Sequence, residues 1–147
     1  MKRLLANLVM LGCICSSSTS YGQMGMMGTS MVRHHFVMMN GIDPQYASKE
    51  NPLRPTMQNI DGGKRLFEQS CARCHGTTGL GDGPDGENLF PRPANIAASS
   101  KMPMASDSYL LWTISEGGVP VGSSMPPFKG SLKEEDIWKI VVYLRLL

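Results

Sequence analysis

Three side chains that can bind metals or carry redox chemistry stand together in Cys71-Ala72-Arg73-Cys74-His75. Two thiols three positions apart suit a redox disulfide, half of a zinc site, or the covalent attachment of a haem. An imidazole directly after the second thiol suits the haem in particular, because it can bind the iron while the thiols hold the porphyrin. The identity of this motif therefore decides the chemistry of the protein.

Each alternative to the haem leaves part of the motif unexplained. A structural zinc wants four nitrogen or sulfur ligands, and the sequence has no second Cys-x-x-Cys pair. A redox dithiol of the thioredoxin type follows a β-strand, and no strand pattern precedes residue 71. A simple disulfide gives His75 no role. We therefore predict one haem c, held covalently by Cys71 and Cys74 and bound through its iron by His75.

A second axial ligand is expected if the iron serves electron transfer, and a methionine thioether is a soft donor suited to that task. Met102, Met104 and Met125 are the candidates. Met125 stands in Ser-Ser-Met-Pro-Pro-Phe, a proline-stiffened loop between two predicted helices, where a methionine has no helical face to fill. We predict that Met125 is the iron ligand. For Met102 and Met104, cover over the haem edge is an equal alternative to ligation.

The first 22 residues have the order of a secretory signal, with Lys2 and Arg3 before an apolar run and small residues before Gln23. This order predicts cleavage after Gly22 and a periplasmic location. The apolar run is shorter than the roughly 20 residues that a membrane-spanning helix needs. In the alternative interpretation Cys13 carries a lipid, and only then is the protein associated with a membrane.

The charge balance excludes one class of partner. The chain has 14 basic and 12 acidic residues, and removal of the signal takes away Lys2 and Arg3, which leaves no net charge. A nucleic-acid partner is therefore not expected. With 18% charged and 41% hydrophobic residues, the composition is that of an ordinary globular protein.

The regular structure that the sequence predicts is helical. One helix, capped by Asn59 or Asp61, leads into the cysteines. A second begins at Asp107 and ends at a glycine, and a third follows a capping box formed by Ser131 and Glu134. Glycine- and proline-rich loops separate them. The result is an all-α domain of three to four short helices and long loops wrapped round one haem, because so small a domain needs a prosthetic group to complete its core.

The chain divides into a signal peptide at 1–22, an N-terminal arm at 23–58 and the helical domain at 59–147. The arm is rich in methionine and then in proline, and no helical or strand period persists through it. We predict an irregular arm that docks a partner and does not bind the iron. The alternative is a copper site, since imidazole and thioether donors suit copper, with the ligands His34, His35, Met38 and Met39.

Residues 59–147 resemble a class I cytochrome c, the small soluble monohaem c-type cytochromes of bacteria. The resemblance rests on Cys-x-x-Cys-His at Cys71–His75, on Met-Pro-Pro-Phe beginning at Met125, and on the last helix, all in the family's order. It implies the cytochrome c fold. The Met-rich arm lies outside the resemblance.

The resemblance also implies how the helices and the proximal imidazole are held. The first and last helices of the family cross where a small residue and an aromatic residue face the last helix, here at Gly63, Phe67, Ile140 and Tyr143. A proline carbonyl that follows the haem motif holds the imidazole and fixes its orientation, and the sequence offers Pro91 or Pro93 for this.

The function that the resemblance implies is one-electron transfer in the periplasm between redox proteins, with no enzyme activity and no small-molecule substrate. His75 and Met125 would stay on the iron in both redox states, so that little rearranges. The alternative is a cytochrome c subunit of a periplasmic oxidoreductase complex, with the arm at 23–58 on a catalytic partner. Catalysis at the haem, as in a peroxidase, needs an open iron and is excluded if Met125 binds it.

Overall fold

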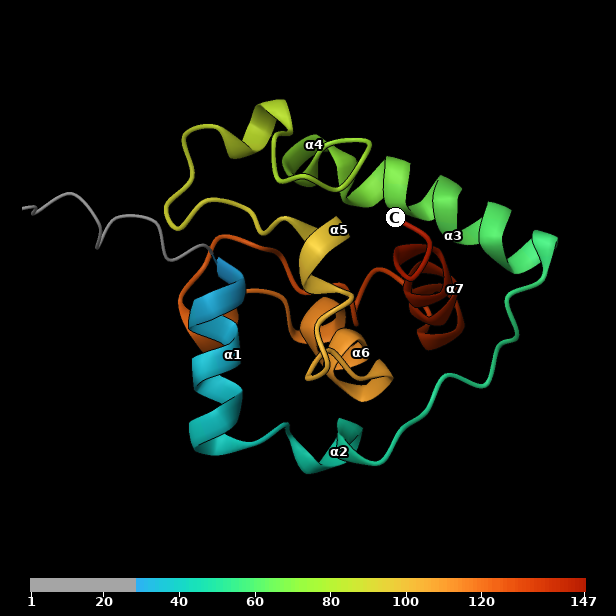
Figure 1. The fold of residues 1–147 in the computed structure, drawn as a ribbon, viewed down its shortest axis with the longest axis horizontal. Helices are drawn as coiled ribbons and strands as arrows, with labels where there is room; N and C mark the ends of the chain where they lie inside the picture. Colours follow the sequence, from blue (N-terminus) through green and yellow to red (C-terminus); the bar gives the residue numbers. More distant parts are fainter. Residues whose placement is uncertain (1–28) are drawn as a thin grey trace, which may run out of the picture.

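The computed structural model describes residues 29–147, and every regular element in this range is helical, which confirms the predicted all-α fold (Figure 1). The predicted signal peptide at 1–22, with the alternative lipid site Cys13, lies outside the described residues. In chain order the elements are α1 (Thr29–Asn40), α2 (Pro44–Ala47), α3 (Met57–Ser70), α4 (Ala72–His75), η2 (Pro84–Gly86), α5 (Ile96–Ser99), α6 (Asp107–Glu116), η3 (Val119–Val121) and α7 (Glu134–Leu144).

Helices α3 and α7 cross at close range, as expected for the first and last helices of the domain (Figure 1). A Cβ atom added to Gly63 would lie 2.0 Å from the backbone oxygen of Lys139, so only glycine allows the two backbones to approach this closely. One turn further on, the rings of Phe67 and Tyr143 meet with 5.5 Å between their centroids. Phe67 and Ile140 belong to the same buried core. The predicted crossing is therefore confirmed.

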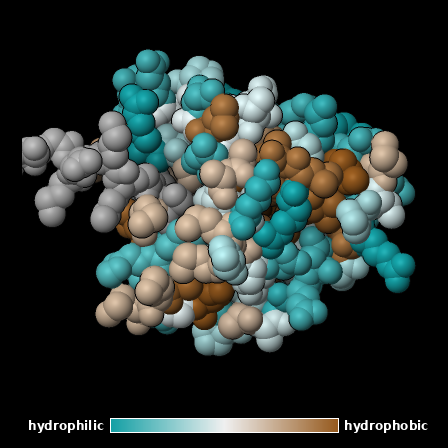
Figure 2. Space-filling model, viewed as in Figure 1, coloured by the Kyte–Doolittle hydropathy of each residue, from teal (hydrophilic) through white to brown (hydrophobic). Residues whose placement is uncertain are grey.

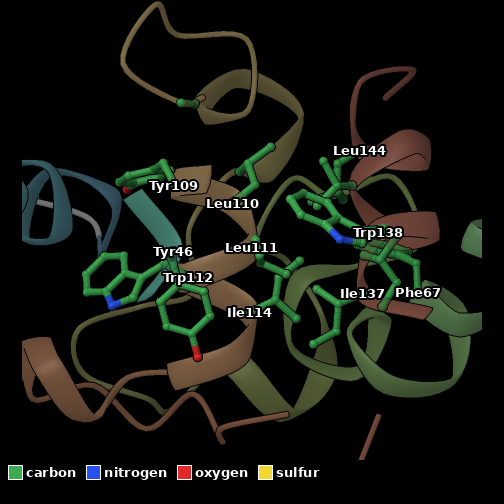
Figure 3. Close-up of a cluster of buried hydrophobic side chains, with 13 residues drawn as sticks. Tyr46, Phe67, Tyr109, Leu110, Leu111, Trp112, Ile114, Ile137, Trp138 and Leu144 are labelled. Carbon is green, nitrogen blue, oxygen red and sulfur yellow. The ribbon is translucent and has the colours of Figure 1, made fainter. Parts of the chain in front are cut away.

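Helix α6 is buried on most of its faces, and several of its side chains belong to the hydrophobic cluster drawn in Figure 3. Its sequence has no polar stripe, which is typical of a helix surrounded by protein. Leu111 is completely buried, and Tyr109 and Trp112 are nearly so. Ser106 caps the helix by accepting a hydrogen bond from the backbone N–H of Tyr109, and Gly117 ends it with a φ of 64°. This helix is the scaffold for the elements on either side.

The segment before α3 is more ordered than the sequence predicts. The arm was expected to be irregular, but residues 29–40 form α1 and a second short helix, α2, follows. Gly41 ends α1 with a φ of 75°, and its N–H donates to the carbonyl of Val37 at 2.8 Å. Helix α1 lies beside η3 and α2 beside α6. The irregular interpretation is therefore wrong for α1, which is stabilised by contacts with residues far away in the sequence.

The remaining stretch before α3 is extended and runs round the outside of the molecule (Figure 1). The side-chain amide of Asn51 donates to the backbone carbonyl of Trp138 at 3.0 Å, and Lys49 pairs with Glu134 at 2.5 Å. These contacts tie the extended stretch to α7.

Two of the predicted helix caps are wrong. Helix α3 begins at Met57, and its cap is Thr56, whose side chain accepts a hydrogen bond from the N–H of Asn59. At the start of α7 the cap position is Lys133, which makes no side-chain capping bond. Ser131 instead donates to the carbonyl of Phe128. Both errors are local, because several polar residues compete for each cap and the sequence does not decide among them.

Figure 2 shows hydrophilic groups over much of one face, with hydrophobic groups gathered most clearly in a patch right of centre. Two of the large exposed hydrophobic side chains, Leu80 and Phe90, belong to the loop between α4 and α5. Within residues 29–147, each helix is too short or too polar to cross a lipid bilayer.

Candidate haem site

The cysteine motif occupies a single helical turn at the end of α3. Cys71 is both the C-cap of α3 and the N-cap of α4, so the backbone passes from one helix directly into the other. The N–H of Cys71 donates to Phe67, and the N–H groups of Cys74 and His75 both donate to the carbonyl of Cys71. Because these bonds close one turn, the two thiols and the imidazole are held together and all line one cavity.

The Cys71 thiol lies in an environment that disfavours the thiolate. Both cysteines of the motif are free, and burial raises the pKa of Cys71 to about 12, with a smaller contribution from the neighbouring Cys74. Reactive Cys-x-x-Cys pairs instead have a thiol whose pKa is lowered and whose thiolate attacks disulfides. Among the described residues there is also no strand before this motif and no group of three or more metal-ligating His, Cys, Asp and Glu side chains. The dithiol and zinc interpretations therefore find no support in this region.

The imidazole of His75 is oriented by a backbone carbonyl. Its Nδ1 lies 3.0 Å from the carbonyl oxygen of Ala94, so Nδ1–H can donate and Nε2 is left for a metal. Burial lowers the pKa of His75, and the bond to Ala94 opposes this to a smaller extent. The expected carbonyl of Pro91 or Pro93 is therefore the wrong one. Both prolines line the cavity, but the chain presents the oxygen of the next residue, Ala94.

Met125 lines the same cavity as the cysteine motif, and its loop is fastened to the end of α6. The carbonyl of Met125 accepts from the N–H of Gly118 at 2.7 Å, and the N–H of Phe128 donates to the carbonyls of Ile114 and Ser115. A Cβ atom added to Gly117 would lie 2.5 Å from the backbone of Pro126. The loop therefore contacts the end of α6 both before and after Pro126 and Pro127.

The other two candidate methionines lie elsewhere. Met102 and Met104 belong to the turn between α5 and α6, and neither lines the cavity. Met102 is partly exposed. Within the described residues, Met125 is therefore the candidate methionine that shares the cavity with the cysteine motif.

The cavity has the composition that a porphyrin requires. Beside the thiols, His75 and Met125, its walls are mainly apolar, with Leu89, Pro91, Pro93, Ile96, Leu110, Ile114, Phe128, Ile140 and Leu144. Two thiols can form thioether bonds to the vinyl groups, imidazole and thioether donors can take the two axial positions, and the apolar walls exclude water from the ring. The residues present thus fit a c-type haem.

Helix α1 also reaches this cavity, which the sequence did not predict. Arg33 is one of the lining residues and is buried. The signal available in the sequence was weak, because Thr29–Asn40 contains no glycine or proline and is followed by Gly41, a pattern that permits a helix. The many methionines of this segment made its helical pattern hard to recognise.

The alternative copper ligands on α1 have different environments. His34 is buried and its ring stacks on Tyr109, with 5.2 Å between the ring centroids. Met38 and Met39 are 74% and 71% exposed, and His35 is exposed as well. His34 thus serves as a packing residue between α1 and α6.

The helical fold, the Cys-x-x-Cys-His turn and the cavity that it shares with a methionine loop define a c-type cytochrome domain. Residues 58–144 match the family model described as cytochrome c oxidase, cbb3-type, subunit III. The match covers more than half of the chain, which therefore belongs to this cytochrome c family and carries haem c. Helices α1 and α2 precede the matched range.

Two further comparisons give relatives that share the sequence at a similar level. The thiosulfate dehydrogenase of Psychrobacter arcticus is 28% identical over 107 residues, which cover 70% of this chain and 30% of that protein. A chain of the reducing HAO-like protein complex of Kuenenia stuttgartiensis is 29% identical with a TM-score of 0.55, covering 63% of this chain and 45% of that chain. The chain thus spans less than half the length of either relative.

Cytochrome cL of the marine methylotrophic bacterium Methylophaga aminisulfidivorans is a more distant structural neighbour. It is 22% identical with a TM-score of 0.46, and the alignment covers 78% of this chain and 66% of that chain.

Proposed function

We propose that this protein is an exported one-electron carrier that holds one haem c between His75 and Met125. The observation that carries the proposal is that Met125 and the Cys71–His75 turn line one apolar cavity, whereas Met102 and Met104 do not. When bound, the haem supplies a single iron that alternates between its ferric and ferrous states. A thioether ligand favours the ferrous state and so raises the reduction potential.

The residues of the chain would each have a defined task. Cys71 and Cys74 would hold the porphyrin through thioether bonds, and His75 would bind the iron through Nε2 while Ala94 fixes the ring by accepting from Nδ1. Met125 would close the other axial position, because its loop is bonded to the end of α6. With both axial positions closed, small molecules would not reach the iron, and the protein would not be an enzyme.

Substitution of the methionine tests this assignment directly. In Met125→Ala we expect loss of the far-red absorption of ferric iron–sulfur ligation, a lower reduction potential and binding of carbon monoxide by the ferrous form. Met102→Ala and Met104→Ala are matched controls and should change none of these. Retention of the far-red band in Met125→Ala, or its loss in either control, would show that another residue is the ligand.

Export is the second part of the proposal. The charged, apolar and small-residue order of residues 1–22 supports cleavage before Gln23, and Cys71 and Cys74 would then be the only cysteines of the mature chain. Intact-mass measurement of the protein from the periplasm should give a chain that starts at Gln23 plus one haem. An acylated Cys13 or an intact Met1 would contradict this.

The alternative is a cytochrome c subunit of a periplasmic oxidoreductase complex. It is supported by the two relatives, one named as a dehydrogenase and the other as part of a complex, both of which are longer than this chain. Native mass measurement separates the two, because a free carrier is expected to be a monomer and a subunit to co-purify in a stoichiometric complex. In either case the electron donor and acceptor are redox proteins.

A further inference from the structure

A buried guanidinium on α1 has unusual surroundings. Arg33 is only 3% exposed, and its Nη2 donates to the carbonyl of Gly117 at 2.7 Å. Its guanidinium carbon lies 5.2 Å from the centre of the Trp112 ring, which gives a cation–π contact. Its other terminal nitrogen, Nη1, is buried without any hydrogen-bond partner. A charged donor therefore lies in the wall of the haem cavity with one side unpaired.

The chain offers this charge no counter-ion. Among the described residues, no carboxylate lies within ion-pair distance of Arg33, and residues 1–28 contain no Asp or Glu. Glu116, next to Gly117, is already engaged by the hydroxyl of Tyr46 and the ammonium of Lys129. Burial lowers the pKa of Arg33, but a guanidinium keeps its proton in proteins. A buried charge with one unpaired donor is costly, so an anion from outside the chain would stabilise it.

A second unpaired donor lies in the same cavity wall. The hydroxyl of Ser123 is buried and has no hydrogen-bond partner, and this residue also lines the cavity. The two residues are joined through one turn, because Arg33 donates to the carbonyl of Gly117 and the N–H of Ser123 donates to the carbonyl of Gly118. A cationic donor and a neutral donor thus meet the cavity beside the same two glycines.

We propose that Arg33, with the hydroxyl of Ser123 beside it, binds a propionate carboxylate of the haem. This inference rests on the proposed haem site and adds to it a binding residue that lies outside residues 58–144, the range shared with the cytochrome family. A guanidinium suits this task, since its planar fork matches the two oxygens of a carboxylate. Helix α1 would then be part of the haem site. The positive charge of Arg33 would offset the negative charge of the propionate near the iron.

The reduction potential reports this pairing. In Arg33→Gln the propionate loses its positive partner, so the ferric state gains stability and the potential is expected to fall. The potential should also become dependent on pH, because the unpaired propionate takes up a proton in mild acid. Arg65→Gln is the matched control, since it makes the same charge change on an exposed residue that does not line the cavity, and it should leave the potential and its pH profile unchanged.

Among the residues that line the cavity, no other group is expected to produce such a pH profile between pH 5 and 8. His34, beside Arg33 on α1, lies outside this wall, and burial and then the charge of Arg33 lower its pKa. With haem bound, Cys71 and Cys74 would be held in thioether bonds and His75 would bind the iron. Burial raises the pKa of Tyr109 to about 12, so this hydroxyl stays protonated. A merely structural role of Arg33 would lower stability without making the potential depend on pH.

The outcomes separate this inference from the proposed function. A wild-type spectrum with the far-red band establishes the haem and its ligands whatever Arg33 does. The inference is overturned if Arg33→Gln has the same potential and pH profile as Arg65→Gln. If Arg33→Gln does not take up haem, Ser123→Ala decides in its place. In Ser123→Ala, the reduction potential should fall by less than the amount expected for Arg33→Gln and should show the same kind of pH dependence, which would support the pairing. A potential and pH profile identical to those of the wild type would overturn it.

Discussion

The two ends of the haem cavity are built in different ways. The Cys71–His75 turn is held by hydrogen bonds between neighbours in the sequence, within a single helical turn. Helix α1 is held by contacts with residues far away, among them the bond from Arg33 to Gly117 across 84 positions. The first region is a local motif that a short stretch of sequence specifies. The second exists only because the rest of the domain provides α6 and its following turn as a surface.

The same contrast separates the segment before α3 from the rest of the chain. The domain from α3 to α7 has its own crossing of helices, whereas α1 and α2 pack on α6 through aromatic and polar contacts, and Tyr46 of α2 joins the same buried core. We therefore expect substitutions at the crossing to affect the whole domain. Substitutions in the N-terminal segment should loosen α1 and α2 and have smaller effects.

The largest effect is expected at the crossing of α3 and α7. An alanine normally stabilises a helix by about 1 kcal/mol relative to glycine. In Gly63→Ala, however, the new Cβ would meet the backbone oxygen of Lys139 at 2.0 Å, so the helices must separate, at a cost of about 3 kcal/mol. Chemical denaturation of the haem protein measures this. Gly62→Ala is the control, because its Cβ meets only the flexible side chain of Lys139, and equal losses in both variants would refute the close crossing.

A smaller effect is expected where α1 packs on α6. The rings of Phe36 and Trp112 stack with 6.0 Å between their centroids, and Phe36 is half-buried. Phe36→Ala should therefore lower the free energy of unfolding by about 1–2 kcal/mol. His35→Ala, at an exposed position of the same helix, should change it by less than about 0.5 kcal/mol. If Phe36→Ala has as little effect as His35→Ala, α1 does not pack on α6 in solution.

The smallest effect is expected for the polar link between α2 and α6. The hydroxyl of Tyr46 donates to Glu116 at 2.6 Å, and Tyr46→Phe removes this hydroxyl with its interactions with Glu116 and Ser115, which should cost about 1 kcal/mol at neutral pH. Hydrogen bonds from Lys129 and then from Tyr46 lower the pKa of Glu116. Because the folded-state pKa is depressed, the stabilisation is present above the ordinary glutamate pKa and is lost as the pH falls through the folded value.

The pH dependence of this link can be measured with the same pair of proteins. The stability difference between wild type and Tyr46→Phe should be constant near neutral pH and should shrink in acid, below about pH 4. A difference that is independent of pH would show that Glu116 is not the acceptor.

The sequence predicted the local features of the domain well. Two thiols followed by an imidazole allow few chemistries, and the Met-Pro-Pro loop and the glycine–aromatic pair on α3 each depend on a few neighbouring residues. These features identify the fold class, the haem motif and the crossing of α3 with α7. Met125 as ligand remains a prediction, which its place in the cavity supports.

The features that the sequence did not predict depend either on contacts between residues far apart in the sequence or on a choice between adjacent residues. The carbonyl that faces His75 is set by the path of the loop before α5. Pro91, Pro93 and Ala94 are close together in the sequence, so the sequence alone does not distinguish among them. Helix α1 has little amphipathic pattern of its own, and its buried Arg33 and His34 violate the usual expectation for polar residues. Contacts with residues far away in the sequence explain them: Arg33 contacts Gly117 and Trp112, and His34 stacks on Tyr109.

The optical spectrum of the purified protein, oxidised and reduced and with carbon monoxide added to the reduced form, decides between a closed and an open haem iron. We predict a covalently bound low-spin haem, a far-red band in the ferric protein and no change on addition of carbon monoxide. A ferric spectrum without the far-red band, together with ready binding of carbon monoxide, would show an open iron and contradict the closed carrier with His75 and Met125 as its ligands.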